Sequence, residues 1–198
     1  MKRKPIIFAI LSCVLVAFML AACAGMTVKP TESNFQDPKI TLSHVEVPYY
    51  TGYWYFSKKV KPTKGSAGNY GAPMGLGFVF DIENLNKFPV QLEGFKFSIA
   101  FEEFELNTVS SNETQWIPAG KTNQLRVNAI MDARSALLSL LVTGGFKLKE
   151  AGMSPWDALE KWWTEAPDAS YPIYIQQGGA IFSAGGMTKP VAFNAMFP

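Results

Sequence analysis

Histidine, cysteine and charge are all scarce in this sequence of 198 residues. One histidine cannot form a two-histidine metal site, and two cysteines exclude a disulfide scaffold and most zinc sites. Charged residues make up only 17% of the chain, too few for an intrinsically disordered protein, whereas apolar residues make up 48% and can supply a core. Length and composition therefore predict one globular domain of ordinary size, or at most two small ones.

The first 22 residues are typical of a secretory signal peptide. Lys2, Arg3 and Lys4 form a basic start, and an uncharged stretch of 17 residues extends from Ile6 to Ala22. A stretch of that length is at the lower limit for crossing a bilayer as a helix, so a retained transmembrane anchor is the alternative. The residues that end the stretch favour cleavage instead.

Residues 20–23 read Leu-Ala-Ala-Cys, which resembles the lipobox of bacterial lipoproteins. The resemblance implies that residues 1–22 are removed and that Cys23 carries a diacylglycerol on its sulfur and an N-acyl group such as palmitate. Two or three acyl chains make a stable membrane anchor. Because Ala24 stands where inner-membrane retention signals place Asp, the expected location is the periplasmic side of the outer membrane if the organism is a diderm.

Removal of the signal peptide changes the charge balance. It takes away three of the 18 basic residues and no acidic residue, so 15 basic and 16 acidic residues leave a net charge of −1. A near-neutral chain lacks the basic excess that generic nucleic-acid binding requires, so we expect no nucleic-acid partner. The expected partners are the membrane, through the lipid anchor, and a lipid or an envelope protein.

Residues 23–38 are predicted to form a lipidated tether. Pro30, Pro38 and the polar residues between them favour an extended, disordered chain. From Ala24 to Asp37 such a chain spans at most roughly 45–50 Å. The folded domain, residues 39–198, therefore stays close to its membrane.

Alternation of apolar and polar residues predicts β-strands through most of residues 39–198. The predicted strands lie at Ile40–Val47, Leu76–Ile82, Val90–Phe101, Leu125–Met131, Tyr171–Ile175 and Val191–Phe197. The alternation changes phase within the first strand and at Gly94, where a bulge would restore the core face. Six or seven short strands joined by glycine- and proline-containing turns favour an antiparallel sandwich or barrel.

Helical spacing interrupts the strand pattern between about residues 132 and 166. Apolar residues recur at helical spacing from Ala133 to Val142, and Gly144-Gly145 is expected to end that helix. Ser154 is predicted to cap a second helix with Asp157 in a near capping box, and Pro167 is predicted to end it. The prediction is therefore a mainly β domain with a short two-helix insert.

The turn between the second and third predicted strands resembles a family signature. Asn84-Leu85-Asn86 followed by Pro89, between two apolar strands, is similar to the turn of type 2 late embryogenesis abundant proteins, a group that contains the water-stress and hypersensitive-response domain. That family commonly has proline at the position of Leu85. The resemblance covers about residues 40–198 and implies an immunoglobulin-like or fibronectin type III-like sandwich. An unrelated lipoprotein sandwich with a chance asparagine-rich turn is the alternative.

The motifs of common enzymes are missing. The sequence has no G-x-S-x-G, no H-E-x-x-H and no G-x-x-x-x-G-K-[ST]. His44 is interpreted as a satisfied strand histidine, and Glu102, Glu103 and Glu105 as a solvated rim rather than a metal site or an acid–base pair. We therefore expect no enzyme activity, no cofactor and no metal; a hydrolase with an unrecognised site is the remote alternative.

Two aromatic clusters are candidates for membrane or partner contact. Trp54 and Tyr55 belong to an aromatic run that precedes four lysines, which suits a lipid headgroup boundary; a strand covered on both faces is the alternative. Trp162 and Trp163 are adjacent and cannot share one helix face, so Trp162 is predicted to be exposed or to touch a partner, with Trp156 and Trp163 packed inward.

Together these patterns predict a membrane-anchored, non-enzymatic binding or stress-protective module of the cell envelope. An apolar or lipid ligand between the two sheets is one form of that function. The alternative is a structural or adaptor subunit that docks an envelope protein complex.

Overall fold

The computed structural model describes residues 28–53 and 71–198. The predicted signal peptide, Cys23, Trp54 and Tyr55 lie outside the described residues. The strands are β1 (Lys39–Tyr50), β2 (Met74–Glu83), β3 (Val90–Phe101), β4 (Phe104–Ser111), β5 (Gln115–Ile117), β6 (Thr122–Met131), β7 (Ile173–Ala184) and β8 (Met187–Phe197). The helical segments are α2 (Ala133–Ser139), the π-helix η2 (Leu140–Gly144), α3 (Gly145–Glu150), α4 (Pro155–Glu165) and the 3-10 turn η3 (Ala166–Asp168).

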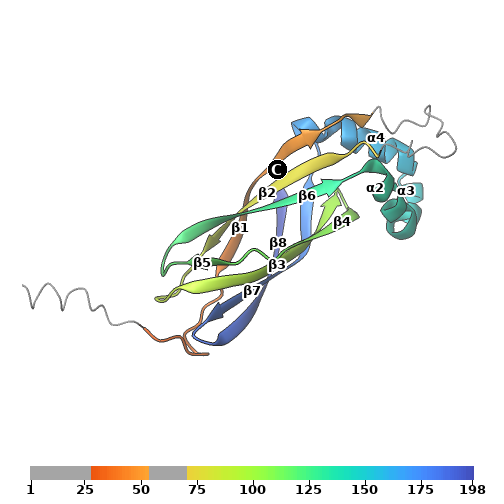
Figure 1. Ribbon diagram of the computed structural model, residues 1–198. Coiled ribbons are helices and arrows are strands. Elements are labelled where there is room, and N and C mark those ends of the chain that lie inside the picture. The colour runs from red at the N-terminus through yellow and green to blue at the C-terminus, as the bar shows by residue number, and fades with distance from the viewer. Residues whose placement is uncertain (1–27, 54–70) are drawn as a thin grey trace, which may run out of the picture.

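The strands form two antiparallel sheets that pack face to face (Figure 1). One sheet has the order β1-β2-β6; the other has the order β4-β3-β7-β8, with β5 also paired to β3. Aromatic rings join the sheets: the centroids of Phe78 and Phe97 lie 5.2 Å apart and those of Phe80 and Phe95 lie 4.9 Å apart. The predicted mainly β antiparallel sandwich is confirmed.

The two phase changes in the sequence correspond to irregularities in strand register. The pairing of β3 with β7 shifts between Leu92 and Gly94, and the pairing of β1 with β2 shifts between Leu42 and His44. The strands β4 and β5 were missing from the prediction. The acidic residues at 102, 103 and 105 suggested a solvated rim, yet Phe104 and Leu106 between and after them are buried and begin β4.

The helical insert lies at one end of the elongated sandwich, and the described chain begins at the other end (Figure 1). The first helix does not stop at Gly144-Gly145 as predicted, because both glycines keep right-handed helical dihedrals and α3 continues to Glu150. Gly144 instead allows close packing: a Cβ there would lie 2.9 Å from Cδ1 of Phe104. The helix ends where Gly152 takes a left-handed conformation, φ +69°.

The second helix begins as the sequence predicts. The hydroxyl of Ser154 accepts a hydrogen bond from the backbone N–H of Asp157, and Pro155 takes the first helical position. Pro167 falls in the 3-10 turn that follows α4. Within the described parts of the chain, no helix is long and apolar enough to cross a membrane.

We predict that Gly178→Ala destabilises the domain by about 2–3 kcal/mol, the cost of forcing extra atoms into a packed site. A Cβ at Gly178 would lie 2.4 Å from the carbonyl oxygen of Phe193, which is backbone of the paired strand β8 and cannot rotate away. The matched control is the neighbouring Gly179→Ala, whose Cβ would meet no atom nearer than Cε of Lys96 at 3.7 Å. Equal denaturant midpoints for the two variants would contradict the described register of β7 and β8.

Candidate functional site

The signature turn forms a buried polar network. Asn84 is fully buried and Asn86 nearly so. The side-chain amide of Asn84 donates to the carbonyl oxygens of Phe88, Ile117 and Pro118 at 2.9, 3.0 and 3.2 Å. Its oxygen accepts from the backbone N–H of Asn86 at 2.9 Å and from the Asn86 side chain at 3.0 Å. The two asparagines therefore satisfy each other and the carbonyl groups around them.

Asn86 extends this network to the segment that precedes the sandwich. Its side-chain nitrogen donates to the carbonyl oxygen of Gln36 at 2.9 Å, and its oxygen accepts from the N–H of Gln36 at 2.7 Å. Beside it, Phe35 is buried against Phe88 with ring centroids 5.8 Å apart. Lys189 on β8 donates to the carbonyl of Phe35 and pairs with Asp37 at 2.8 Å.

These contacts correct the predicted tether. Residues 31–35 form a turn, with the N–H of Phe35 bonded to the carbonyl of Thr31, and the chain is fixed to the sandwich from Phe35 onward. The composition of residues 23–38 resembles disordered chain, but the segment contains an aromatic residue, Phe35, which is buried in the core of the sandwich. We call this set of contacts, Phe35–Gln36 with Asn84, Asn86 and Lys189, the asparagine clamp.

Pro89 stays at the surface, directly before β3 begins. The segment Ile117–Lys121 lies against the turn: the N–H of Asn84 donates to the carbonyl of Lys121 at 2.9 Å, and the N–H of Gly120 donates to the carbonyl of Asn86 at 3.2 Å. The clamp and its neighbours thus hold four segments of the chain together: residues 35–37, 84–88 and 117–121, and Lys189 on β8.

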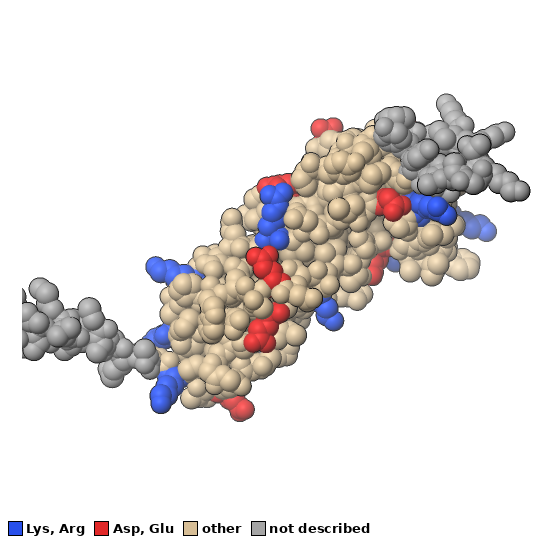
Figure 2. All heavy atoms as spheres, viewed as in Figure 1, with Lys and Arg blue, Asp and Glu red and all other residues tan. Residues whose placement is uncertain are grey.

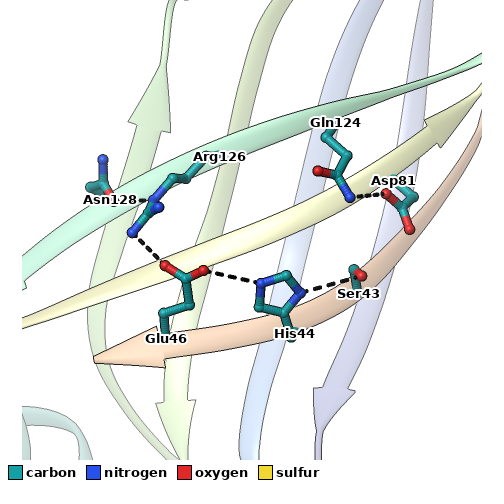
Figure 3. Close-up of polar contacts among 7 residues, drawn as sticks. All are labelled: Ser43, His44, Glu46, Asp81, Gln124, Arg126 and Asn128. Atoms are coloured by element: carbon teal, nitrogen blue, oxygen red, sulfur yellow. Dashed lines mark hydrogen bonds and ion pairs between the residues drawn. The ribbon is translucent and has the colours of Figure 1, made fainter. Parts of the chain in front are cut away.

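A second polar cluster contains the single histidine and lies on the outer face of the three-stranded sheet (Figure 3). Nε2 of His44 lies 3.1 Å from Oε1 of Glu46, and Nδ1 lies 3.3 Å from the hydroxyl of Ser43. The other oxygen of Glu46 lies 2.5 Å from Nη2 of Arg126 on β6. Gly77 lies between them on the central strand, where a Cβ would come within 3.0 Å of that nitrogen.

The contacts from Ser43 to His44 and from His44 to Glu46 resemble those of a hydrolytic triad, but the surroundings of the carboxylate are different. A triad carboxylate is buried and held for the histidine. Here the side chains of His44 and Glu46 are 45% and 38% exposed, and Glu46 shares its charge with Arg126. The cluster is built as a cross-strand ion pair, and it gives no support for nucleophilic catalysis at Ser43.

The junction between the insert and the sandwich is aromatic, and it corrects the prediction for Trp162. This side chain is fully buried, with its ring 5.6 Å from Phe104 and 6.0 Å from Phe101. Trp163 is also fully buried, and its Nε1 donates to the carbonyl of Ala72. Both tryptophans are covered because α4 is packed on two sides, by the β3–β4 end and by the chain before β2.

Trp156, which was expected to pack inward, is 37% exposed instead. The carbonyl of Trp156 accepts from the hydroxyl of Tyr53 at 3.3 Å, and the carbonyl of Trp163 accepts from the hydroxyl of Tyr50 at 2.6 Å. Tyrosines at the end of β1 and beyond thus hold α4 against the sheet.

Burial raises the pKa of three tyrosines at this junction. It raises the pKa of Tyr53 to about 12, with Glu160 and Asp157 adding to the effect, and it raises the pKa of Tyr50. Burial raises the pKa of Tyr171 above its usual range, and Glu165, Tyr50 and Glu102 raise it further. An unfolded tyrosine ionises near pH 10, so these three tyrosines keep their hydroxyl protons to a higher pH in the folded state than in the unfolded state. The stabilisation is present below pH 10 and is lost as the pH rises towards 12.

We therefore predict that Tyr171→Phe reduces this alkaline loss of stability. The Tyr171 hydroxyl is buried with no hydrogen-bond partner among the described residues, so its removal leaves no partner unpaired and is neutral or slightly stabilising at pH 8. Urea midpoints at pH 8 and pH 11 test both statements, with Tyr49→Phe on the exposed sheet face as control. A clear loss of stability at pH 8 in Tyr171→Phe alone would contradict the unpaired hydroxyl.

Aromatic side chains in contact with one another occupy the space between the two sheets, where an apolar ligand was expected. Phe193 on β8 joins Phe80 and Phe95 there, at 5.7 and 4.6 Å. A groove of about 620 Å³ lies instead on the outer face of the five-stranded sheet, across β4, β3, β7 and β8. Its lining consists of Gly94, Phe95, Lys96, Ser110, Asn112, Gly179, Ala180, Ile181, Pro190, Val191 and Ala192.

The insert carries an exposed apolar surface that the sequence analysis did not identify. It consists of Leu138, Leu141, Val142 and Phe146, and we call it the insert patch; Val142 is 85% and Phe146 88% exposed. Within the π-helical turn Leu140–Gly144, Leu140 is fully buried, whereas Leu141 and Val142 face solvent.

Charge is sparse on the surface of the described chain. On the face seen in Figure 2, lysine and arginine alternate with aspartate and glutamate over a largely uncharged surface. No group of three or more metal-ligating side chains occurs in residues 28–53 and 71–198. Lys161 pairs with Glu102 at 2.5 Å, and Lys147 lies 3.6 Å from Glu103, so two of the three clustered carboxylates have basic neighbours.

No family model and no curated protein matches this sequence. Solved structures with a similar course of the chain include a protein from Archaeoglobus fulgidus, 11% identical, with a TM-score of 0.40 over 79% of this chain and 94% of that chain. Another is described as an ApaA protein from Bordetella pertussis, 12% identical, with a TM-score of 0.38 over 82% of this chain and 93% of that chain. A likeness of this degree carries no argument about family or function.

Proposed function

We propose that this chain is a lipid-anchored, non-enzymatic binding module of the bacterial cell envelope. Its anchor is Cys23, and its place is the periplasmic side of the outer membrane in a diderm organism. The observation that carries the proposal is the asparagine clamp, which fixes the chain to the sandwich at Gln36, 13 residues after Cys23. Because so few residues lie between the anchor and the clamp, the end of the sandwich that carries the clamp would stay next to the membrane.

The clamp orients the domain relative to that anchor. Pro30 lies beside Gly185 in the β7–β8 turn, at the end of the sandwich opposite the insert. Pro30 is the seventh residue after Cys23, which corresponds to at most about 25 Å of extended chain. An anchored domain would therefore keep its clamp end at the membrane and direct the insert away from it. The similarity of the clamp turn to type 2 late embryogenesis abundant proteins supports a protective role in envelope stress, with a lipid or another apolar ligand.

Labelling with palmitate of cells that make the full chain tests the anchor. We expect the parent chain to incorporate the label and Cys23→Ser to lose it, because the variant has no thiol to acylate at the lipobox. Cys13→Ser is the matched control, since Cys13 belongs to the predicted signal peptide and leaves with it. Equal incorporation of palmitate by Cys23→Ser and by the control would reject the anchor.

The insert patch favours a second candidate, an adaptor subunit that docks an envelope protein. Four large apolar side chains exposed side by side are unusual on a monomeric surface and are typical of interaction sites. Photocrosslinking from Phe146 in cells tests this function, with Trp116, an exposed aromatic residue on β5, as the control position. One stoichiometric protein crosslinked from Phe146 alone would favour the adaptor; equal, diffuse crosslinks from both positions would reject it.

A further inference from the structure

The outer-face groove has a shape that fits an extended molecule. It takes in three consecutive positions on each of β3, β7 and β8, namely 94–96, 179–181 and 190–192, and it reaches Ser110 on the fourth strand, β4. At the usual spacing of strands and residues, that is a strip about 14 Å long and about 7 Å wide. The volume of about 620 Å³ lies within the range of ligand pockets in proteins.

Small residues at paired positions of neighbouring strands create this strip. Gly179 pairs with Lys96 on one side and with Ala192 on the other, and Gly94 pairs with Ile181. Since Phe95 and Phe97 face the core, Lys96 between them faces outward. Gly179 and Ala192, which lie in register with Lys96, are on the same outer face. The missing side chain at Gly179 leaves the floor open, and the stem of Lys96 lies across it, with Cε 3.7 Å from the position of a Cβ.

The lining changes in chemistry along the strip. Its polar groups are Lys96 on β3, Ser110 on β4 and Asn112 just after β4, whereas β7 and β8 present carbon, chiefly Ile181 and Pro190. Lys96 is the single charged residue of the lining, and it makes no ion pair within the described chain. A flexible lysine ammonium is suited to meet an anionic group.

We propose that this groove binds a single-chain anionic amphiphile, such as a fatty acid or a lysophospholipid. Its hydrocarbon chain lies over β7 and β8, and its headgroup meets Lys96 and the polar rim on β4. A narrow strip with one polar end, one cation and no acid matches one acyl chain with one anionic head. The inference deepens the lipid-binding part of the proposed function and rests on it, because the groove lies in the half of the sheet that leads to the clamp end.

Photolabelling of the full chain in phosphatidylcholine nanodiscs tests the groove, with photoreactive dodecanoic acid as the probe. We expect saturable labelling of residues 179–192 that falls at least fivefold in Ala192→Phe, which fills the apolar end. Ile130→Phe, an exposed position on the other sheet, is the matched control and should label like the parent chain. Labelling that does not saturate, that is equal in both variants, or that maps to the insert patch would overturn the proposal.

Charge reversal gives a second readout that does not depend on filling the groove. Lys96→Glu should reduce labelling by the acid probe at least fivefold and leave labelling by the corresponding photoreactive alcohol unchanged. An equal loss for both probes would show that the substitution acts on the sheet and not on a headgroup, and it would overturn the role of Lys96.

Labelling in cells distinguishes two sources of the bound acyl chain, a free amphiphile and the chain's own lipid anchor. In cells fed the photoreactive acid, an occupant that is a free amphiphile leaves the mass of a lipid on a groove peptide, whereas the chain's own anchor links that peptide to the Cys23 peptide. Either result keeps the groove, and a groove peptide without any lipid mass would reject it. An unacylated Cys23 with a labelled groove would instead reject the anchor and keep the binding site.

Discussion

Replacing Trp162 with alanine is expected to lower the free energy of unfolding by about 3–5 kcal/mol, the usual cost of removing a large aromatic side chain from a core. Trp162 is fully buried and contacts Phe101 and Phe104 on the sandwich. Its Nε1 has no hydrogen-bond partner among the described residues, so the loss is one of packing and not of a hydrogen bond. Urea unfolding followed by far-ultraviolet circular dichroism measures it.

The matched control is Trp116→Ala on β5, where the side chain is 57% exposed. We expect that variant to change stability by less than about 1 kcal/mol, because exposed positions contribute little. If both variants lost stability equally, or if Trp162→Ala unfolded like the parent chain, the insert would not be docked on the sandwich through α4.

Replacing Asn84 with alanine is expected to cost at least about 3 kcal/mol, since each buried polar group that loses its partner costs about 1–3 kcal/mol. The variant would leave the carbonyl oxygens of Phe88 and Ile117 without the Asn84 donor, and Asn86 without an acceptor for its N–H. Asn194→Ala, at an exposed position of β8, should stay within about 0.5 kcal/mol of the parent chain.

Asn84→Asp separates hydrogen bonding from shape. An aspartate has the same size but offers only acceptors when ionised, so it would face the surrounding carbonyl oxygens without a donor. We expect at neutral pH a loss at least as large as that of the alanine variant. A stable Asn84→Asp protein would show that the three donated bonds are not what holds the turn.

Local patterns in the sequence were sufficient for the sandwich itself. The parity of Leu92 and Phe95 around Gly94 predicts the register shift between β3 and β7, because side chains alternate strictly along a strand. The N-cap at Ser154 was predictable for a similar reason, since capping depends on residues three apart. The asparagine turn was predictable as a turn, but its bonds to Gln36, 50 residues away, depend on the fold.

The predictions that were wrong concern residues whose surroundings depend on contacts in the tertiary structure and not on local sequence. A helical wheel assigns Trp162 and Trp163 to different faces, but α4 is covered on both of them. Gly144 resembles a helix stop, yet it serves close packing on Phe104. The groove around Gly179 could not be identified from sequence, because the strip exists only when four strands are in register.

Intact-mass spectrometry of the protein extracted from membranes tests the central claim most directly. The account predicts a mature chain that begins at Cys23 and carries the mass of a diacylglycerol and an N-acyl chain. A chain that retains residues 1–22, or one whose Cys23 is unmodified, would contradict the account. The domain would then need another reason for the clamp that fixes its N-terminal segment at Gln36.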